Sequence, residues 1–557
     1  MFRRIALLLP FLSFLRSSTQ ALPTDDCPIL GPSFPSNFDP SSTTVIRELQ
    51  SRFPAQLESL LSSGVINRTH TSFSINVFSA VTNSSIFSYH HAAPGLNGSL
   101  TAGVLNDDTL YRIGSVSKLL SVYAILVKAG MEIFDHPVTR YLPELAGNAG
   151  SDPLERISWE EVTVGALASQ LAGTGGMQFL TLMRTRKRPV VPPFETALYS
   201  DAGFGILGRV LERLTGLPYA DAVQSILFAP LGLNGTSARQ PRREGLNAVV
   251  LPGSFAESSW GFDNQITAPS GGLYSNTADL RTTGLSILHS ALLPPRTTRA
   301  WLKPQSQTAS LTTTIGAPWE INRLALPVSP SSPRTRISDL YTKLGGQTGY
   351  AAVFALSPDH ALGFSVLVAG PRAGSARFPL RDAVGEAWVT AAEHAAAENA
   401  ARNFAGTFVD PSVDGANLTL TVQRDRPGLG LEAWFVRGVD WRANLTYPAA
   451  ALPVANLSVR LYPTGLVTLS PSSPSLNASA GAAQLSFRAI PLLLPPGPRA
   501  AVEGGQGLFD NGCQSWSSVD FWSVDGYGID EFVFEVAGGR LESVRSLAAG
   551  TRMRRID

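Results

Sequence analysis

The sequence predicts an α+β region followed by an all-β region, on three observations. Between residues 43 and 403, apolar side chains at helical spacing alternate with short β-rich segments. From residue 404 onward, segments with period-2 alternation dominate and are separated by Gly, Pro, Asn and Ser. Lysine, which occurs only at positions 118, 128, 187, 303 and 343, is absent from this second part. We therefore expect a linker near residues 400–410.

The chain begins with a segment typical of export. Arginines at positions 3 and 4 precede an apolar stretch over residues 5–15, and the small residues at 19 and 21 offer a cleavage site, so residues 1–21 are interpreted as a signal peptide. The apolar stretch is too short to span a bilayer, and no later segment reaches 18 uninterrupted apolar residues. We expect a secreted protein without a membrane span, whose mature chain starts near Leu22.

Residues 22–42 are rich in Pro, Ser and Asp and predict an extended N-terminal arm. The α+β domain, expected over residues 43–403, opens with a helix at 43–62 and a hairpin with strands at 72–79 and 85–90. Further helical patterns recur along this domain, and strand patterns lie near its end. The helices are expected at 162–172, 203–215, 219–227, 277–289 and 379–403, and the strands at 351–355 and 363–368.

Residues 404–557 are expected to form a separate C-terminal all-β domain. The number and spacing of its strands suit a sandwich or a barrel. The alternating segments lie at 417–422, 429–436, 458–461, 465–469, 484–488 and 531–536.

Two further features agree with export. Cys27 and Cys513 are the only cysteines, and in an oxidising compartment a disulfide could tie the arm to the C-terminal region. The alternative, two unrelated buried thiols, stays open because a sequence does not fix connectivity. Eight Asn-x-Ser/Thr tripeptides are candidate glycosylation sites. They begin at Asn67, Asn83, Asn97, Asn234, Asn417, Asn444, Asn456 and Asn477.

Charge and metal-ligand spacing narrow the functional classes. The net charge is +1 and the basic residues are scattered, which argues against nucleic acid or an anionic surface as partner. The two cysteines are far apart and the seven histidines show no metal-binding spacing, so no metal site is expected.

The strongest chemical signal is a serine followed by a lysine three positions later, Ser115 and Lys118, at the start of an apolar helical pattern. Positions i and i+3 share one face of a helix. The positive end of the helix dipole favours a developing alkoxide, and the same field together with burial lowers the pKa of the amine. The pair can therefore act as nucleophile and proton partner. The alternative is a surface lysine on an amphipathic helix.

A second signal is Tyr199, followed by Ser200 and Asp201 at the start of a glycine-containing helical pattern. Beside two ammonium groups the phenolate of Tyr199 would be favoured, and the tyrosine would serve as general base and then general acid. The alternative is a core tyrosine that only forms a hydrogen bond.

The third signal is Lys343, followed by Leu344 and two glycines. Glycines at a strand edge let backbone N–H groups approach a ligand. The N–H groups of Ser115 and Gly346 are candidates for an oxyanion hole, and Lys343 would supply charge to an anionic substrate group or to Tyr199. Alternatively, this is a glycine turn with a solvated lysine.

These motifs, in this order, resemble those of the penicillin-recognising serine enzymes, in particular the branch of class C β-lactamases, D-aminopeptidases and esterases. Four blocks carry the resemblance: Tyr111–Lys118, which we call the nucleophile segment, Tyr199–Leu233, Ser270–Leu280 and Gly345–Tyr350. It covers roughly residues 45–400 and is greatest to secreted fungal β-lactamase-like proteins with an extra C-terminal β domain.

The resemblance implies a β-lactamase/transpeptidase-like domain, with an antiparallel sheet flanked by helices plus a helical subdomain. It implies Ser115 as the acylated nucleophile, Lys118 as its proton partner, Tyr199 as the base and Lys343 as electrostatic support. It implies no metal or organic cofactor.

Two positions depart from the family pattern. The tyrosine block usually has asparagine where Asp201 stands, and an ionised aspartate cannot donate to a substrate carbonyl. Asp201 would also pair with Lys118 and raise the pKa of the amine, which moves the proton transfer toward Tyr199. Leu344 replaces a small hydroxyl residue suited to a substrate carboxylate. Both changes point away from lactams.

We therefore expect a secreted serine hydrolase that acts through an acyl-enzyme on an ester or amide of a small molecule. The alternatives are an acyltransferase, or a metabolite-processing or binding protein on the same scaffold. Besides Asp201, the aromatic residues Trp260, Tyr274 and Tyr350 are candidate substrate-binding residues, although each could equally belong to the core. The oligomeric state does not follow from the sequence.

Overall fold

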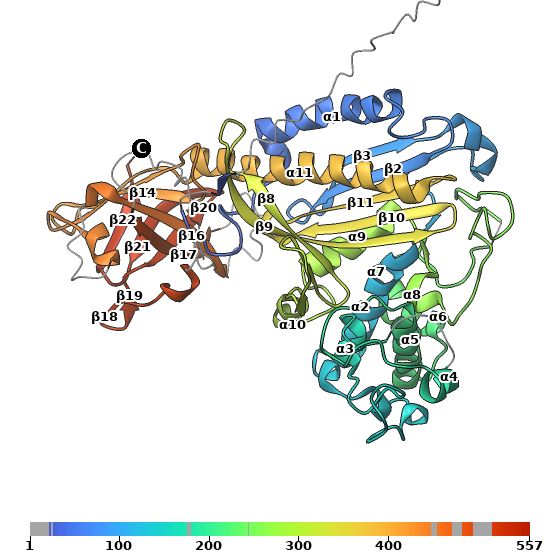
Figure 1. Ribbon diagram of the computed structural model, residues 1–557. Coiled ribbons are helices and arrows are strands. Elements are labelled where there is room, and N and C mark those ends of the chain that lie inside the picture. Colours follow the sequence, from blue (N-terminus) through green and yellow to red (C-terminus); the bar gives the residue numbers. More distant parts are fainter. Residues whose placement is uncertain are drawn as a thin grey trace, which may run out of the picture.

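The computed structural model (Figure 1) contains two large sheets joined by one long helix. The signal-peptide segment, Cys513 and Asn477 lie outside the described part of the chain. The described residues are 22–23, 26–174, 180–242, 244–446, 454–469, 482–493 and 515–556.

The first sheet is antiparallel except where β1 (Leu22–Pro23) joins β9 in parallel. The central strands β2, β11 and β10 are buried along their whole length, because helices cover both faces. In order across the sheet, the strands are β3 (Ser84–His91), β2 (Ser72–Ser79), β11 (Leu362–Ala369), β10 (Tyr350–Ser357), β9 (Arg334–Gln347), β8 (Glu320–Pro327), β7 (Thr313–Ile315) and β6 (Ser306–Gln307).

Helices α1 (Thr44–Ser62) and α11 (Ala373–Asn403) pack together on one face of this sheet, and α9 (Thr277–Leu288) packs on the other (Figure 1). Trp388 and Phe53 meet edge to face between α11 and α1, with ring centroids 5.8 Å apart. The apolar stripe of α1 read from the sequence is therefore buried against α11 and the sheet.

A helical subdomain extends below the sheet in Figure 1. Its central helix α2 (Ser117–Ala129) is buried on every side from Ser117 to Leu126, which explains its nearly continuous apolar sequence. The other helices of this subdomain surround α2 or continue the chain toward the sheet. They are α3 (Val164–Ala168), α4 (Leu180–Thr185), α5 (Asp201–Thr215), α6 (Tyr219–Val223), α7 (Ala229–Leu231), α8 (Ala268–Gly271) and α10 (Pro295–Trp301).

The second sheet closes on itself, because β13 pairs with both β12 and β14. Of the two expected architectures it is therefore a barrel, with Phe408, Trp434 and Phe487 fully buried in its core. Its strands are β12 (Gly406–Asp410), β13 (Ala416–Thr421), β14 (Leu429–Val436), β15 (Val439–Asp440), β16 (Leu457–Leu469), β17 (Ala482–Leu493), β20 (Glu531–Ala537), β21 (Arg540–Ser546) and β22 (Thr551–Arg555), and a separate hairpin pairs β18 (Ser523–Val524) with β19 (Tyr527–Gly528).

The N-terminal arm packs against both sheets. The carbonyl of Gly31 accepts a hydrogen bond from Arg336 of β9 at 3.1 Å, whereas Phe34 is buried in the barrel core. Ser515 donates its N–H to the sulfur of Cys27 at 3.3 Å. The arm therefore lies next to the segment that follows Cys513.

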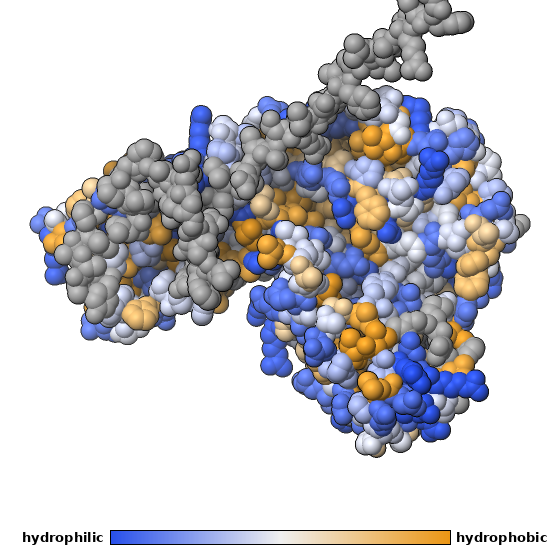
Figure 2. Space-filling view, viewed as in Figure 1, coloured by the Kyte–Doolittle hydropathy of each residue, from blue (hydrophilic) through white to orange (hydrophobic). Residues whose placement is uncertain are grey.

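The surface is mixed. In Figure 2, apolar residues on the helical subdomain form small groups separated by polar side chains. Of the sequon asparagines inside the described residues, Asn67, Asn83, Asn97, Asn234 and Asn444 are exposed, and Asn417 and Asn456 are half-buried. Among the described helices, none combines the length and apolarity needed to cross a membrane.

Candidate active site

Ser115 and Lys118 lie where the chain enters the buried helix α2. Ser115 is in a short 3₁₀ turn, Gly114–Val116, and Lys118 is in the first turn of α2. Lys118 Nζ lies 3.0 Å from Ser115 Oγ, 2.5 Å from Asp201 Oδ1 and 2.7 Å from the carbonyl oxygen of Ser270. The Lys118 side chain has no exposed surface. The helical spacing therefore brings the hydroxyl and the amine into direct contact.

Burial is the largest influence on the amine and lowers the pKa of Lys118 to about 8. The carboxylate of Asp201 opposes this shift, and the positive charge of Lys343 adds to it. The expected ion pair with Asp201 is present, but burial outweighs its effect on the amine. About half of the Lys118 amine is therefore neutral near pH 8.

Tyr199 precedes α5, whose N-cap is Ser200; the Ser200 hydroxyl accepts the N–H of Gly203 at 3.0 Å. The Tyr199 ring lies between the two lysines, with its centroid 4.8 Å from Lys118 Nζ and 5.4 Å from Lys343 Nζ. This arrangement places the phenol at the nucleophile.

The expectation of a favoured phenolate is wrong for this structure. Desolvation of the hydroxyl raises the pKa of Tyr199, and the carboxylates of Asp201 and Glu320 raise it further, against a hydrogen bond with Ser115. Each ammonium group has a carboxylate partner, so their charges do not favour the phenolate. The raised pKa means that the phenol of Tyr199 is protonated near neutral pH before the reaction.

Lys343 is buried on β9 and forms an ion pair with Glu320 of β8. Glu320 also accepts the N–H of Leu344 at 2.9 Å through its other oxygen. Sequence reasoning missed Glu320, because only the register of β8 on β9, where Glu320 is paired with Thr342, brings it beside Lys343.

The backbone of β9 reaches the nucleophile segment at Gly345 and Gly346. A Cβ atom on Gly345 would lie 1.9 Å from the Ile113 carbonyl oxygen, and one on Gly114 would lie 2.4 Å from Gly346 N. Gly114 also has φ +51°, which favours glycine. Residues without a side chain are therefore required on both sides of this contact.

The register of the hairpin directs the Gly346 N–H toward this contact. Gln347 and Tyr350 close a two-residue turn, so Gly346, which faces Ala351, occupies a non-hydrogen-bonded position of the β9–β10 ladder. Its N–H consequently points away from β10. Leu344, two residues earlier on β9, occupies the same kind of position in the ladder. Its N–H also points away from β10 and donates to Glu320.

A buried clamp connects three parts of the site. The guanidinium of Arg112, on β4 (Tyr111–Arg112), donates to Gln347 Oε1 from Nε at 3.0 Å and from Nη2 at 2.9 Å. The amide of Gln347 in turn donates to the carbonyl of Gly271. Gly271 follows Ser270, the carbonyl partner of Lys118. The clamp thus ties β4, β9 and α8 together, and sequence reasoning missed it.

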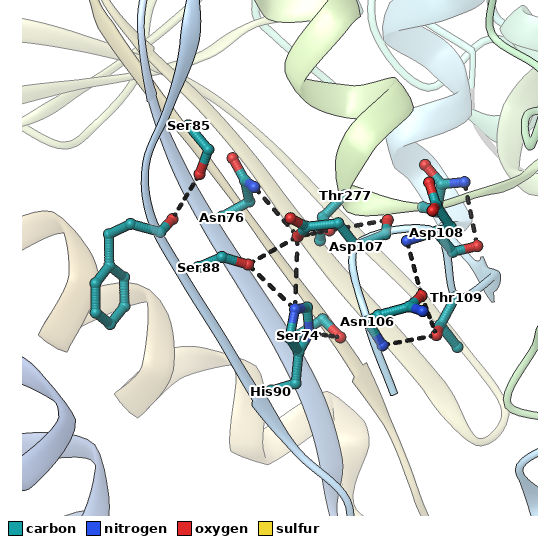
Figure 3. A network of polar contacts seen from close by, with 12 residues as sticks. Ser74, Asn76, Ser85, Ser88, His90, Asn106, Asp107, Asp108, Thr109 and Thr277 are labelled. Atoms are coloured by element: carbon teal, nitrogen blue, oxygen red, sulfur yellow. Dashed lines mark hydrogen bonds and ion pairs between the residues drawn. The ribbon is translucent and has the colours of Figure 1, made fainter. Parts of the chain in front are cut away.

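A polar network links β2 and β3 to the residues that precede the nucleophile segment (Figure 3). Asp107 accepts a hydrogen bond from Thr277, at the start of α9, at 2.7 Å and lies 3.6 Å from His90 Nε2. His90 Nδ1 is 2.9 Å from Ser74 Oγ, which is 3.0 Å from the Tyr111 hydroxyl. These contacts hold β4, the strand with which the nucleophile segment begins, against the sheet.

The three aromatic candidates for substrate binding belong to the core. Trp260, Tyr274 and Tyr350 are 5%, 0% and 0% exposed. The Tyr350 hydroxyl donates to a backbone carbonyl at 2.9 Å, and the Arg112 guanidinium lies 4.4 Å from the Tyr274 ring centroid. Their packing supports the alternative reading of these residues, whereas Asp201 lies at the site and is 41% exposed.

Comparison with known proteins agrees with this architecture. The family model described as "Beta-lactamase" matches residues 89–387, and one described as "Beta-lactamase-like-like, C-terminal domain" matches residues 396–557. The first model covers more than half of the chain and includes the nucleophile, tyrosine and glycine blocks.

Three relatives illustrate the range of the similarity. A "Beta-lactamase-like protein" of Arthroderma benhamiae is 28% identical over 95% of each chain. "Probable hydrolase M10" of Phoma sp. is 27% identical over 63% of this chain and 64% of its own length. "Esterase EstB" of Burkholderia gladioli is 30% identical over 28% of this chain and 45% of its own. The resemblance read from the motifs is therefore confirmed, and so is the α+β fold with its all-β C-terminal region: the chain belongs to the β-lactamase family of serine hydrolases.

Proposed function

We propose that this protein is a secreted serine hydrolase of the class C type that cleaves an ester or small amide through an acyl-enzyme at Ser115. The contact between Lys118 Nζ and Ser115 Oγ, with an amine pKa of about 8, carries the proposal. The hydrolase and esterase names of the relatives agree with it.

The surroundings of Lys118 suit a neutral amine that accepts the serine proton. A neutral amine has two N–H donors and one lone pair. Asp201 and the Ser270 carbonyl are two acceptors, which leaves the lone pair for the hydroxyl of Ser115. Lys118 then takes this proton as the serine oxygen attacks the acyl carbon.

The remaining steps follow from the other groups of the site. The N–H groups of Ser115 and Gly346 stabilise the oxyanion, and Tyr199 protonates the leaving group. A water molecule then attacks the acyl-enzyme and gives a proton to the Tyr199 oxygen, which lost its own proton to the leaving group. Lys118 returns its proton to the Ser115 oxygen as the acid product leaves. Lys343, neutralised by Glu320, holds the ring of Tyr199 in place.

Covalent labelling tests the proposal. A fluorophosphonate probe or an activated p-nitrophenyl ester should add one group to the intact protein, and peptide mapping should place it on Ser115. Ser115→Ala should take no label and show no turnover. Absence of both labelling and turnover across short acyl chains would contradict the proposal. Added alcohol distinguishes hydrolysis from acyl transfer by the partition of the acyl group.

We also propose export with a Cys27–Cys513 disulfide and glycosylation. The contact of Cys27 with Ser515, two residues after Cys513, supports the disulfide, and the exposed sequons support glycosylation. The intact mass of secreted protein before and after reduction, alkylation and deglycosylation tests both.

Gln347→Ala is expected to lower kcat by about tenfold to a hundredfold with little change in KM, because the clamp positions Gly346 and the Ser270 carbonyl. Gln347→Glu keeps the acceptor for Arg112 but loses the donor for Gly271, so its kcat should lie between those of Gln347→Ala and wild type. Gln305→Ala, at an exposed position, is the control. Unchanged kcat in Gln347→Ala, at a wild-type thermal midpoint, would contradict a positioning role.

A further inference from the structure

The two ion pairs of the site have the same orientation relative to solvent. The side chains of Lys118 and Lys343 are 0% and 1% exposed, whereas those of their partners Asp201 and Glu320 are 41% and 25% exposed. In both pairs the positive charge is therefore buried and the negative charge faces solvent.

Both carboxylates are close to the reacting groups. Asp201 contacts Lys118, which contacts Ser115, and Glu320 contacts Lys343. The ring of Tyr199 lies against both ammonium groups, and its hydroxyl feels the charge of both carboxylates. Two partly exposed carboxylates, one on α5 and one on β8, therefore lie next to the groups that surround Ser115.

These carboxylates can accept further hydrogen bonds. Among the described contacts, Asp201 uses only its Oδ1 atom as an acceptor. An ionised carboxylate accepts but does not donate, so it complements a cationic nitrogen and repels a substrate carboxylate.

One arginine counteracts the negative charge of the two carboxylates. The guanidinium of Arg377, on α11, interacts with Glu320 and Tyr199. It donates to the carbonyl of Gly345 and lies 4.7 Å from the Phe378 ring centroid. Arg377 is therefore engaged on the α11 side of β9. The two ammonium groups of the ion pairs are buried, so the carboxylates are the partners in each pair that face solvent.

We infer that the site selects acyl substrates that carry a positively charged nitrogen near the scissile bond over substrates that carry a carboxylate, with Asp201 and Glu320 as the specificity-determining residues. This inference rests on the proposed function. It explains in charge terms why the two departures from the family motifs occur together: Asp201 adds a negative charge, and Leu344, whose N–H is bonded to Glu320, removes a contact suited to a carboxylate.

Three p-nitrophenyl esters of equal chain length test the inference. They end in trimethylammonium, in the isosteric neutral tert-butyl group, or in carboxylate. For wild type, kcat/KM should be highest for the cation and lowest for the anion, with a cation-to-anion ratio of at least about tenfold at low salt. Salt should compress this ratio, because mobile ions screen exposed charges.

Glu320→Gln and Asp201→Asn should each move the cation-to-anion ratio toward one, and Arg377→Gln should increase it. Glu155→Gln, which removes an exposed carboxylate paired with Arg188, should leave the ratio unchanged. Both rates come from one preparation, so the ratio does not depend on the fraction of folded enzyme.

The outcomes separate the two proposals. If the neutral ester is turned over but the anion is cleaved as fast as the cation, or neither Glu320→Gln nor Asp201→Asn changes the ratio, the inference is wrong and the hydrolase proposal stands. If none of the esters is cleaved and Ser115 takes no label, the hydrolase proposal fails and the inference fails with it.

Discussion

Lys118→Arg should lower kcat by at least about a thousandfold, although it preserves the positive charge next to Ser115. Arginine stays protonated in proteins, so it cannot accept the serine proton. Lysine at this position can, because burial lowers its pKa to about 8. The measurement is the rate of p-nitrophenyl ester cleavage together with the rate of fluorophosphonate labelling of Ser115.

The guanidinium is larger than the ammonium group, and the Lys118 side chain is fully buried. Two further variants therefore separate the loss of the base from a steric effect. Lys118→Met has nearly the same volume without the amine and should be equally inactive. Lys128→Arg makes the same change at an exposed position on α2 and should keep wild-type activity. Activity of Lys118→Arg within tenfold of wild type would rule out a proton-accepting amine.

The pH profile provides a second readout of the same prediction. If the neutral amine is the base, kcat/KM should rise with pH through a midpoint near 8. The Asp201 carboxylate stabilises the ammonium form and so raises the pKa of Lys118. Asp201→Asn should therefore move the midpoint to lower pH. A profile that is flat between pH 6 and 9, or a shift to higher pH, would contradict the assignment.

Local parts of the site could be predicted from the sequence because their geometry depends on spacing along one element. Ser115 and Lys118 are three residues apart on a helical turn, so their contact follows from the helix itself. The hairpin of β2 and β3 and the helix α1 lie within a residue or two of the ranges expected from periodicity.

Other parts depend on pairing between distant segments. Glu320 reaches Lys343 only through the register of β8 on β9, and Arg112 reaches Gln347 across 235 residues. The strands β6 to β9 were not expected. β6 and β7 span only two and three residues, and in β8 and β9 apolar and polar residues do not alternate regularly. The direction of the pKa shift of Tyr199 could not be predicted either, since it depends on two carboxylates and on burial.

The helix α11 begins earlier than its sequence pattern predicts. The pattern predicted its start at Pro379, a residue favoured in the first turn, but the helix begins at Ala373. The additional turns place Arg377 beside Gly345 of β9, with which it forms a hydrogen bond. A tertiary contact thus accompanies the longer helix, and no local signal indicates it.

Glu393→Ala should destabilise the protein by about 3–5 kcal/mol, because it removes one partner of a buried ion pair. Glu393 of α11 is 1% exposed and Arg336 of β9 is 2% exposed. The carboxylate accepts from Arg336 Nε at 2.9 Å and lies 2.8 Å from His360 Nε2. Without it, the guanidinium keeps only the half-buried Asp359 as an anionic partner among the described residues. Denaturant midpoints, followed by tryptophan fluorescence, measure the loss.

The stabilisation by the Glu393–Arg336 ion pair should decrease in acid. Arg336 and His360 hold the pKa of Glu393 well below its usual range, against the opposing effect of burial. The pair therefore stabilises the protein fully above the pKa of an unfolded glutamate and loses this effect as pH falls through the folded value. The difference in stability between wild type and Glu393→Ala should be larger above the pKa of an unfolded glutamate than in acid, where it should shrink.

Two further variants separate ion-pair loss from loss of packing. Glu386→Gln changes an exposed glutamate on the same helix and should shift the midpoint little. The double variant Arg336→Met, Glu393→Leu removes both charges and should be more stable than Glu393→Ala, since no buried guanidinium is left without its main partner. Because Arg336 also binds the Gly31 carbonyl, Glu393→Ala should expose the N-terminal arm to proteolysis. A midpoint shift in Glu393→Ala no larger than that in Glu386→Gln would show that the network contributes little to stability.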